Sequence, residues 1–586
     1  MGANQSNLSK PGYGYDMVVA VTQSSINGIM KEFLHNSGSP VVSMYYIMDD
    51  SGNPKAITKT ALLKVTGGID PLTILAGTPI TDAKIQALAK ASFWYAFEAK
   101  IGLPPGYAPV NPSGPALPDI VEFTASEGMV DYNLTCSEFQ VVEASYGPKG
   151  IISWLNETQP NGNAWLFNAH VPTSQIPVTD YSNLPSDVKN ATSGLSAGTF
   201  SVQQLLLDLD KAILNTSATI VGVEPGTPLY NALSSVFLGA YFTQLKASGH
   251  PVLNYSIKQA SAPAASISVS DLELWINPFV GANGVKVDHP NATQLNLQTL
   301  NYLCSTAGNS LAPPAQFTWN WVDENELSTT AGVMAIKKSI FVQHLKKELA
   351  EIGAGPSLSR IPIPKIHIKE DLSGGSLSLG FVLGESPQFP LSVRSYHIDN
   401  TGNTVLNFGW SSSGEDESHG YLGVKLGEFK VKYYATSEIA LSGDKITLTN
   451  HFVMHGNLNI LHVGKADGNW IDVTVTTDYV LGVDASGNLT ITQQTPVVGP
   501  NNGNTGENII IKLLHWLDSD ITLSHIVNSF ASWAETISQQ SVDNVAMALN
   551  GSRKWVFPGG KTFSFQSTGF SDSQDLVANL LYNSTH

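Results

Sequence analysis

Apolar positions in the first hundred residues follow two patterns, one typical of buried strands and one typical of amphipathic helices. Residues 15–21 are mostly apolar and β-branched, which predicts a buried strand. The next segment predicts a helix capped by Thr22 or Ser24, because its apolar residues recur at helical spacing: Ile26, Ile29, Met30, Phe33 and Leu34. Residues 41–48 predict the second strand.

The most apolar helix is expected at residues 83–101. Its stripe is thickened by two further aromatic residues, and together they are Ile85, Leu88, Ala89, Ser92, Phe93, Trp94, Tyr95, Ala96 and Phe97. The proline-rich segment 102–118 ends the pattern, and strands are expected near 119–125, 137–145, 150–154 and 164–168. Helices are expected at 202–214 and 228–247, and the second carries Leu233, Val236, Phe237, Ala240, Tyr241 and Leu245.

A second unit of strand followed by helix begins near residue 316. The aromatic alternation of residues 317–321 predicts one strand, residues 332–336 predict another, and a helix is expected at 339–352. Ser25-Ile26 and Ser339-Ile340 align when the two units are superposed. Two explanations stay open, a pair of related modules or two independent amphipathic helices.

The remainder is predicted to be strand-rich and then helical. Residues 361–495 alternate with a period of two, with turns at 442–444, 466–469 and 484–488, and Asp467-Gly468 is the strongest hairpin signal. A Gly/Asn linker at 498–507, a helical stretch at about 508–549 and a strand–helix tail at 554–582 follow. The expected domains are 12–315, an N-terminal module with a long insertion; 316–497, a strand-rich second module; and 498–586, a linker with a helical closure.

Composition narrows the classes of function. The 586 residues carry a formal charge of −17, with 13% charged and 42% hydrophobic residues. An acidic surface repels phosphate backbones and anionic lipid faces, which argues against nucleic acid as a partner. No apolar run is long enough for a membrane-spanning helix, and the first ten residues have no apolar signal core. A soluble protein of the cytoplasm is expected, with non-classical release left open.

The sequence motifs that resemble catalytic or metal-binding signatures lack the context that these signatures need. Gly194–Gly198 spells G-x-S-x-G, but a polar segment precedes it where a nucleophile elbow needs a buried strand. His451, His455 and His462 lie in a predicted sheet, where cross-strand pairing explains them better than a metal. The acidic runs 323–326 and 415–417 lack EF-hand spacing. We expect no cofactor and no metal, and Cys136 and Cys304 leave a single bridge open.

Aromatic helices packed on strongly curved sheets can leave a long apolar groove suited to acyl chains or polycyclic hydrophobes. The expected ligand-binding residues are those on the predicted helix stripes: Trp94, Phe97, Phe237, Tyr241 and Phe341. The alternative is that these side chains only fill the cores.

Three segments resemble the tubular lipid-binding (TULIP) proteins, in particular the OrfX-type accessory proteins of clostridial neurotoxin gene clusters. Residues 13–18 with 26–34 are similar to the opening of that group, 332–349 to the start of its second module, and 556–560 to its C-terminal closure. The matched segments cover about a tenth of the chain directly. Residues 172–315 depart from the group, because this stretch is long and rich in Ser, Ala and Pro.

The resemblance implies an α+β fold, with highly curved antiparallel sheets wrapped around long amphipathic helices in two related modules. It also implies binding of lipids or other hydrophobic small molecules without chemistry. A cofactor-independent cyclase or isomerase acting on a hydrophobic substrate stays open, because such catalysis needs shape and a few hydrogen-bond donors. A toxin-associated interaction protein, with a protein as partner, is a third hypothesis, and sugar binding through Trp410 and Trp470 is a fourth.

Overall fold

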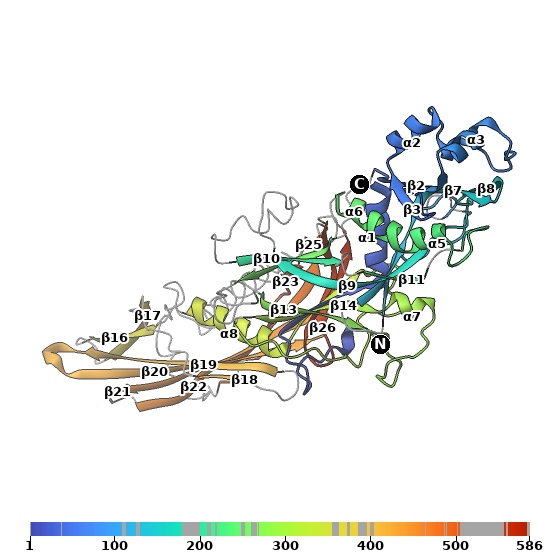
Figure 1. The fold of residues 1–586 in the computed structure, drawn as a ribbon. Coiled ribbons are helices and arrows are strands. Elements are labelled where there is room, and N and C mark those ends of the chain that lie inside the picture. The colour runs from blue at the N-terminus through green and yellow to red at the C-terminus, as the bar shows by residue number, and fades with distance from the viewer. Residues whose placement is uncertain are drawn as a thin grey trace.

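The protein is elongated, with a small helix-capped sheet at one end, a long strand ribbon at the other and a curved sheet between them (Figure 1). The computed structural model describes residues 2–36, 38–107, 113–124, 129–177, 200–207, 212–216, 219–247, 252–259, 267, 269–306, 308–353, 363–371, 376–384, 395–398, 404–462, 464–485, 487, 489–500, 502–503, 556–557 and 561–582. Within these residues, no helix is long and apolar enough to cross a membrane.

In the described part of the chain, thirteen strands form one strongly curved antiparallel sheet. Their order is β13 (Val269–Asn277), β14 (Thr299–Thr306), β1 (Met17–Thr22), β15 (Gly332–Ile336), β27 (Leu576–Tyr582), β26 (Lys561–Phe570), β25 (Val556–Phe557), β12 (Val252–Gln259), β10 (Phe200–Leu207), β9 (Phe167–Pro177), β6 (Met129–Leu134) and β5 (Val121–Phe123), while β11 (Ile213–Thr216) pairs with β9. Bulges or irregularities in four of the strand pairs add local bend and twist to this sheet.

Strand β1 lies inside this sheet, between β14 and β15 and third from the edge that β13 forms. Met17, Val19 and Val21 face the largest apolar core, whereas Val18 and Ala20 face a second core on the other side. Both faces are buried, which explains why the strand is a continuous apolar run. Three neighbouring strands of this sheet, β1, β15 and β27, come from the three predicted domains 12–315, 316–497 and 498–586 respectively. The boundaries of these domains stay a prediction.

A second sheet of five strands packs against two short helices at one end. Its order among the described residues is β3 (Pro54–Ile57), β2 (Val41–Met48), β4 (Phe93–Ile101), β7 (Cys136–Gly147) and β8 (Gly150–Thr158), and its helices are α2 (Lys59–Thr66) and α3 (Ala83–Lys90). The predicted helix at 83–101 is therefore wrong beyond Lys90. Ser92 takes a left-handed φ of 53°, which ends the helical path, and the aromatic residues after it pair with β2 and β7.

The strand-rich segment forms a ribbon of very long hairpins. Among the described residues its order is β18 (Ser395–Ile398), β19 (Thr404–His419), β20 (Lys425–Ser442), β21 (Lys445–Ile460), β22 (Gly464–Val483) and β23 (Leu489–Gln493), with β24 (Val497–Val498) on β22 and a separate hairpin of β16 (Ile363–Asp371) and β17 (Ser376–Gly384). Alternate residues of β20 and β21 are buried, so the ribbon has one apolar face and one polar face.

Several helices that the sequence predicts beside the strands are present: α1 (Gln23–Asn36), the continuous α5 (Pro228–Ala232), π-helix η4 (Leu233–Phe237) and α6 (Leu238–Ala247), and α8 (Lys338–Gly353). The described residues also contain the short helix α7 (Ala292–Asn296) and the 3₁₀ turns η1 (Ala3–Gln5), η2 (Pro71–Thr73) and η5 (Tyr421–Gly423), which the sequence patterns do not predict. Helical structure at 228–247 and at 339–352 is confirmed.

Two further predictions of local structure are wrong. Residues 202–214 belong to strands β10 and β11, apart from 208–211, which the structure does not describe, because they pair with the distant β9 and β12. Residues 317–321 form an irregular segment, because side chains replace the strand ladder: the Asn320 amide pairs with both backbone groups of Val280, and Asn277 accepts from Phe317 N.

The turns and the tail also differ in part. The turns at 442–444 and 484–488 are confirmed, but 466–469 lies inside β22, and the chain reverses instead at Leu461 and His462. In the described residues of the tail, strands β25, β26 and β27 replace the predicted helix. The predicted helix at 508–549 and the segment Gly194–Gly198 lie outside the described residues.

Candidate functional site

A cluster of aromatic side chains lies where the helix α5–η4–α6 packs against strands of both curved sheets. Phe237 is at its centre and fully buried. Its ring centroid is 4.9 Å from Phe139, 5.0 Å from Phe167, 5.9 Å from Phe97 and 5.7 Å from Tyr241. These are ordinary distances for attractive aromatic pairs, so the helix and the strands are joined by ring contacts.

The π-helix explains how Phe237 reaches this position. Thr227 caps the helix by accepting from Tyr230 N, and Pro228 occupies the first turn, where its missing N–H is not needed. The π turn Leu233–Phe237 inserts extra backbone before α6. π turns inside helices are rare and are frequently found at functional sites. This turn therefore marks the aromatic cluster as a candidate site.

The structure brings together three of the five residues that the sequence selects. Phe97 on β4, Phe237 on η4 and Tyr241 on α6 all belong to the aromatic cluster. Trp94 is half-buried at its margin, with its ring 5.9 Å from that of Tyr95. Phe341 on α8 lies elsewhere in the core, against Phe570 at 5.6 Å. Whether these residues line a ligand site stays a prediction.

The sequence patterns do not select several aromatic residues that belong to the cluster. Three of them lie on strands, one just before β9 and one on α6; they are Tyr132, Phe139 and Phe167, then Trp165, and Phe242. The signal for Phe139 and Phe167 is present in the strands expected at 137–145 and 164–168, where each occupies an inward position. Only the pairing of β6 with β9 and of β4 with β7 shows which strands meet the helix.

Polar groups are enclosed within this cluster. The Tyr241 hydroxyl donates to Thr135 O at 3.0 Å and accepts from Thr135 N at 3.3 Å. Burial raises the pKa of Tyr132, Cys136 and Tyr241, and the neighbouring phenol of Tyr132 raises that of Tyr241 further. These groups stay protonated at neutral pH, and the Tyr132 hydroxyl can donate a hydrogen bond in this apolar surrounding.

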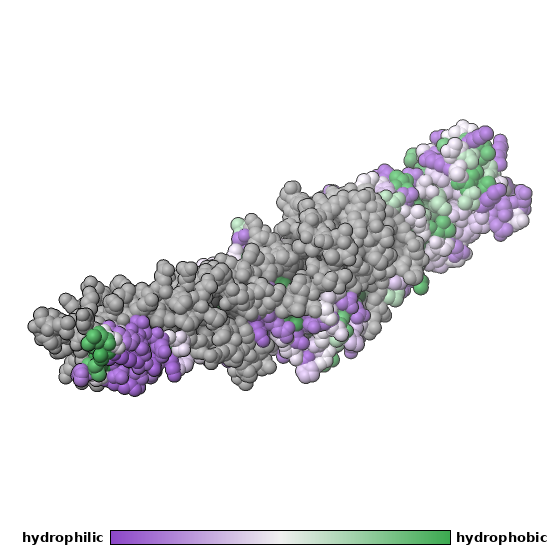
Figure 2. Space-filling view, turned by 90° about the vertical axis from the view of Figure 1, so that its left-hand side faces the viewer, coloured by the Kyte–Doolittle hydropathy of each residue, from purple (hydrophilic) through white to green (hydrophobic). Residues whose placement is uncertain are grey.

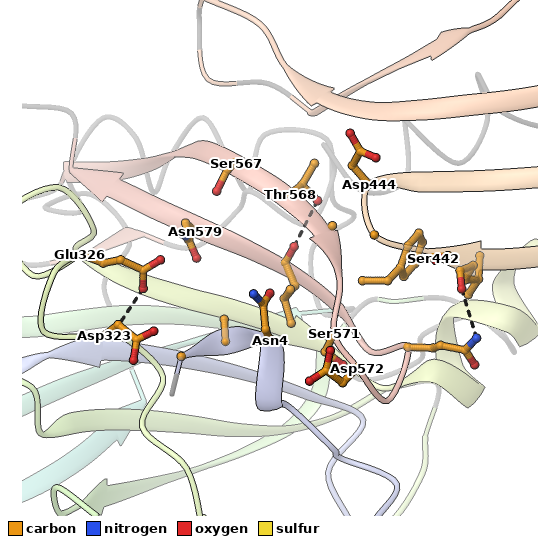
Figure 3. A pocket seen from close by; sticks show the side chains of 18 residues that line it. Asn4, Asp323, Glu326, Ser442, Asp444, Ser567, Thr568, Ser571, Asp572 and Asn579 are labelled. Atoms are coloured by element: carbon orange, nitrogen blue, oxygen red, sulfur yellow. Dashed lines mark hydrogen bonds between the residues drawn. The ribbon is translucent and has the colours of Figure 1, made fainter. Parts of the chain in front are cut away.

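A separate cavity of about 560 Å³ lies between the N-terminal segment, the β20–β21 turn and the β26–β27 hairpin (Figure 3). Its walls carry carboxylates and small polar groups, among them Asn4, Asp323, Glu326, Asp444, Thr568 and Asp572. A surface of this chemistry does not suit an acyl chain, because apolar ligands need apolar walls. The cavity is therefore distinct from the aromatic cluster.

The residues considered for metals and for a disulfide have other partners. His451 Nε2 lies 2.7 Å from Asp472 across the ribbon, and His455 bonds both Asn469 and Asp467. The described residues contain no group of three or more His, Cys, Asp or Glu placed to hold a metal ion. Cys136 and Cys304 are buried and are not joined by a disulfide. The side chains of Trp410 and Trp470 are outside the described part of the structure.

Comparison with known proteins gives limited information. No family model matches the chain, and no curated protein matches its sequence. Among solved structures, the chain is similar to the crystal structure of lipopolysaccharide binding protein with a TM-score of 0.29 and 10% sequence identity, over 98% of this chain and 100% of that chain. A likeness at this level does not assign a fold or an activity.

Proposed function

We propose that the protein binds lipids or other hydrophobic small molecules, without a cofactor, between the helix α5–η4–α6 and the strands that it covers. The single observation that carries this proposal is the aromatic cluster centred on Phe237. It joins a π-distorted helix to strands β4, β7 and β9 through ring contacts. An apolar ligand can enter where the helix separates from these strands, because the surfaces it would touch are already apolar.

The arrangement of the two strand–helix units supports a TULIP-like organisation in two related modules. Strands β1 and β15 are antiparallel neighbours inside the curved sheet, with Val19 opposite Met334. Each of these strands leads directly into a helix, α1 or α8. Two related units placed side by side in opposite directions give this relationship without further assumptions.

The experiment is native mass spectrometry of gently purified full-length protein, followed by organic extraction of whatever co-purifies. We expect a bound lipid or terpenoid-like mass, and uptake of oleic acid or phosphatidylcholine by stripped protein. Phe237→Ala should weaken uptake at least about tenfold. Phe317→Ala is the matched control, because Phe317 is equally buried but belongs to the second core. An empty protein that takes up neither lipid contradicts the proposal.

A second candidate is a cofactor-independent cyclase or isomerase acting at the same cluster. It is favoured by the enclosed hydroxyl of Tyr132, which can donate a hydrogen bond to a hydrophobic substrate, and by the Tyr241 hydroxyl beside it, which is held by Thr135 O. Tyr132→Phe and Tyr241→Phe remove the hydroxyls and keep the rings. Conversion of a bound polyene by the wild type, lost in these variants while uptake persists, would establish the enzyme. If every bound compound is released unchanged, binding is the only function that remains.

A further inference from the structure

Apolar side chains are exposed at the outer end of the strand ribbon, where two turns lie side by side. The β19–β20 turn exposes 90% of Leu422 and 52% of Val424, and the β21–β22 turn exposes 39% of Leu461. The two turns are neighbours because Leu461 N donates to Leu426 O at 2.8 Å. We call Leu422, Val424 and Leu461 the ribbon tip. Figure 2, which views the molecule from this side, shows a hydrophobic patch beside a hydrophilic surface at its lower left.

The backbone holds Leu422 outward in an unfavourable conformation. Its φ is 72°, in the left-handed region that a leucine rarely adopts and that glycine or asparagine tolerates. Gly420 N donates to Val424 O at 2.9 Å, and Gly423 N donates to Gly420 O at 3.1 Å. These bonds fix the turn around the exposed side chain. An observed strain of this kind is a reason to look for a function at the residue.

The polar face of the ribbon behind the tip carries charges that compensate one another. Lys425 pairs with Glu417 and with Glu428, and Lys430 pairs with Glu428 and lies 3.7 Å from Glu415. On the adjacent hairpin, Lys465 lies 3.4 Å from Asp467. Because each of these three lysines has a carboxylate partner, they offer little excess positive charge to anionic lipids.

We propose that the ribbon tip inserts into the surface of a neutral, zwitterionic lipid bilayer. Three apolar side chains at the end of a ribbon can enter the region between headgroups and acyl chains, while the paired charges remain in the aqueous layer. A stable protein interface needs roughly 20–30 residues a side, far more than this tip provides. The proposal does not rest on the aromatic cluster, so either can fail alone.

Two measurements on the full chain test this proposal. The first is flotation with phosphatidylcholine vesicles, comparing the wild type with Leu422→Asp and Leu422→Gly. We expect each variant to reduce the partition coefficient at least about tenfold, because a leucine side chain no longer enters the bilayer. Leu75→Asp is the matched control, because Leu75 is 76% exposed in a loop near the opposite end of the molecule. It should bind like the wild type.

The second measurement places an environment-sensitive dye on Leu422→Cys. Labelling is selective, because Cys136 and Cys304 are buried. Vesicles should shift the emission to shorter wavelength, and lipids with a quencher on the acyl chain should reduce it. The same dye on Ser51→Cys, in an exposed turn after β2, should not respond.

Four outcomes would overturn the proposal. They are a wild type that does not float with the vesicles, equal flotation of Leu422→Asp, a dye at position 422 that lipid quenchers do not reach, and lipid-independent dimers that Leu422→Asp abolishes. The last would assign the tip to contact between copies of this chain. Leu422→Gly keeps the test valid if Leu422→Asp fails to fold, because glycine suits the left-handed turn.

Discussion

The carboxylate of Asp575 accepts a hydrogen bond from the hydroxyl of Ser6 at 2.8 Å, although the two residues are 569 positions apart. The same carboxylate accepts from Leu8 N at 2.6 Å and from Lys338 N at 3.0 Å. One fully buried side chain therefore joins the N-terminal segment, the start of α8 and the β26–β27 hairpin. This junction lies beside the polar cavity of Figure 3.

Removing this carboxylate should loosen the junction. We expect Asp575→Ala to lower the free energy of unfolding by about 3–5 kcal/mol, because three buried donors lose their acceptor. Asp575→Asn should cost about 1–3 kcal/mol, because the amide keeps one acceptor oxygen. Urea denaturation measures both values. The exposed neighbour Asp572 is the control, and Asp572→Asn should be near neutral. Equal stability of all three variants would contradict this role.

Asp575 should also make stability depend on pH. Burial raises its pKa above the ordinary 3.8, although the hydrogen bonds from Leu8, Lys338 and Ser6 lower it. The folded state therefore holds the proton more tightly than the unfolded chain. The stability from the protonated form is complete below about pH 3.8 and is lost as the pH rises through the folded pKa. The stability difference between wild type and Asp575→Asn should shrink with rising pH in urea titrations, and a widening difference would refute this.

Gly332 and Gly239 should respond in opposite ways to the same substitution. A Cβ on Gly332 would lie 2.3 Å from Ala20 O in the neighbouring strand, and backbone cannot move aside cheaply at the centre of a sheet. We expect Gly332→Ala to cost about 3 kcal/mol or more. Gly239 lies in α6 with open space around it, so Gly239→Ala should stabilise by up to about 1 kcal/mol. Thermal unfolding followed by circular dichroism checks the pair.

Substitutions of Phe237 and Trp94 distinguish a role in core packing from a role in ligand binding. Phe237→Ala should cost about 3–5 kcal/mol, because a fully buried ring leaves a cavity among four aromatic neighbours. Trp94 is half-buried, so Trp94→Ala should cost roughly 2 kcal/mol and still weaken lipid uptake. The comparison needs melting temperature and uptake for both variants. Uptake that falls only in proportion to stability would mark both residues as core alone.

Buried phenols and a buried thiol should make the fold sensitive to alkali. Burial raises the pKa of Tyr45 and Tyr146 to about 12, and raises that of Cys136 above its ordinary 9.0. The unfolded chain releases these protons near pH 9–10 and the folded chain does not. Stability should therefore fall as the pH rises from about 9 towards 12. Melting temperatures between pH 8 and 11 measure this fall. In Cys136→Ala the fall should begin at a higher pH, because the thiol no longer contributes to it. A constant melting temperature would disprove it.

Local sequence patterns predict much of the fold, but they fail where contacts with segments distant in the sequence decide the secondary structure. The spacing of apolar residues at 83–101 fits a helix, yet the aromatic residues from Phe93 onward prefer strands and find partners in β2 and β7. Residues 317–321 alternate like a strand. Their aromatic side chains do enter one core together, but Asn277 and Asn320 occupy backbone groups that a strand would pair.

The sequence predicts only part of the candidate site, because contacts between distant segments also decide which aromatic residues meet. Helical spacing places Phe237 and Tyr241 on one face of a helix, and the structure keeps them together. Phe97 joins them although it sits on a strand, because its position in β4 points inward. Phe341 does not, since α8 follows β15 on another part of the curved sheet. The π turn has no sequence signature that separates it from a plain helix.

The position of β1 between two strands that come much later in the sequence has a consequence for how the chain is made. A ribosome releases β1 early, but its two neighbours, β14 and β15, begin only at Thr299 and Gly332. Until then the nascent chain carries an apolar strand with two open edges, which is a template for aggregation. Contacts this distant along the sequence also slow folding. The topology therefore leaves the growing polypeptide with an aggregation-prone strand until β14 and β15 have been made.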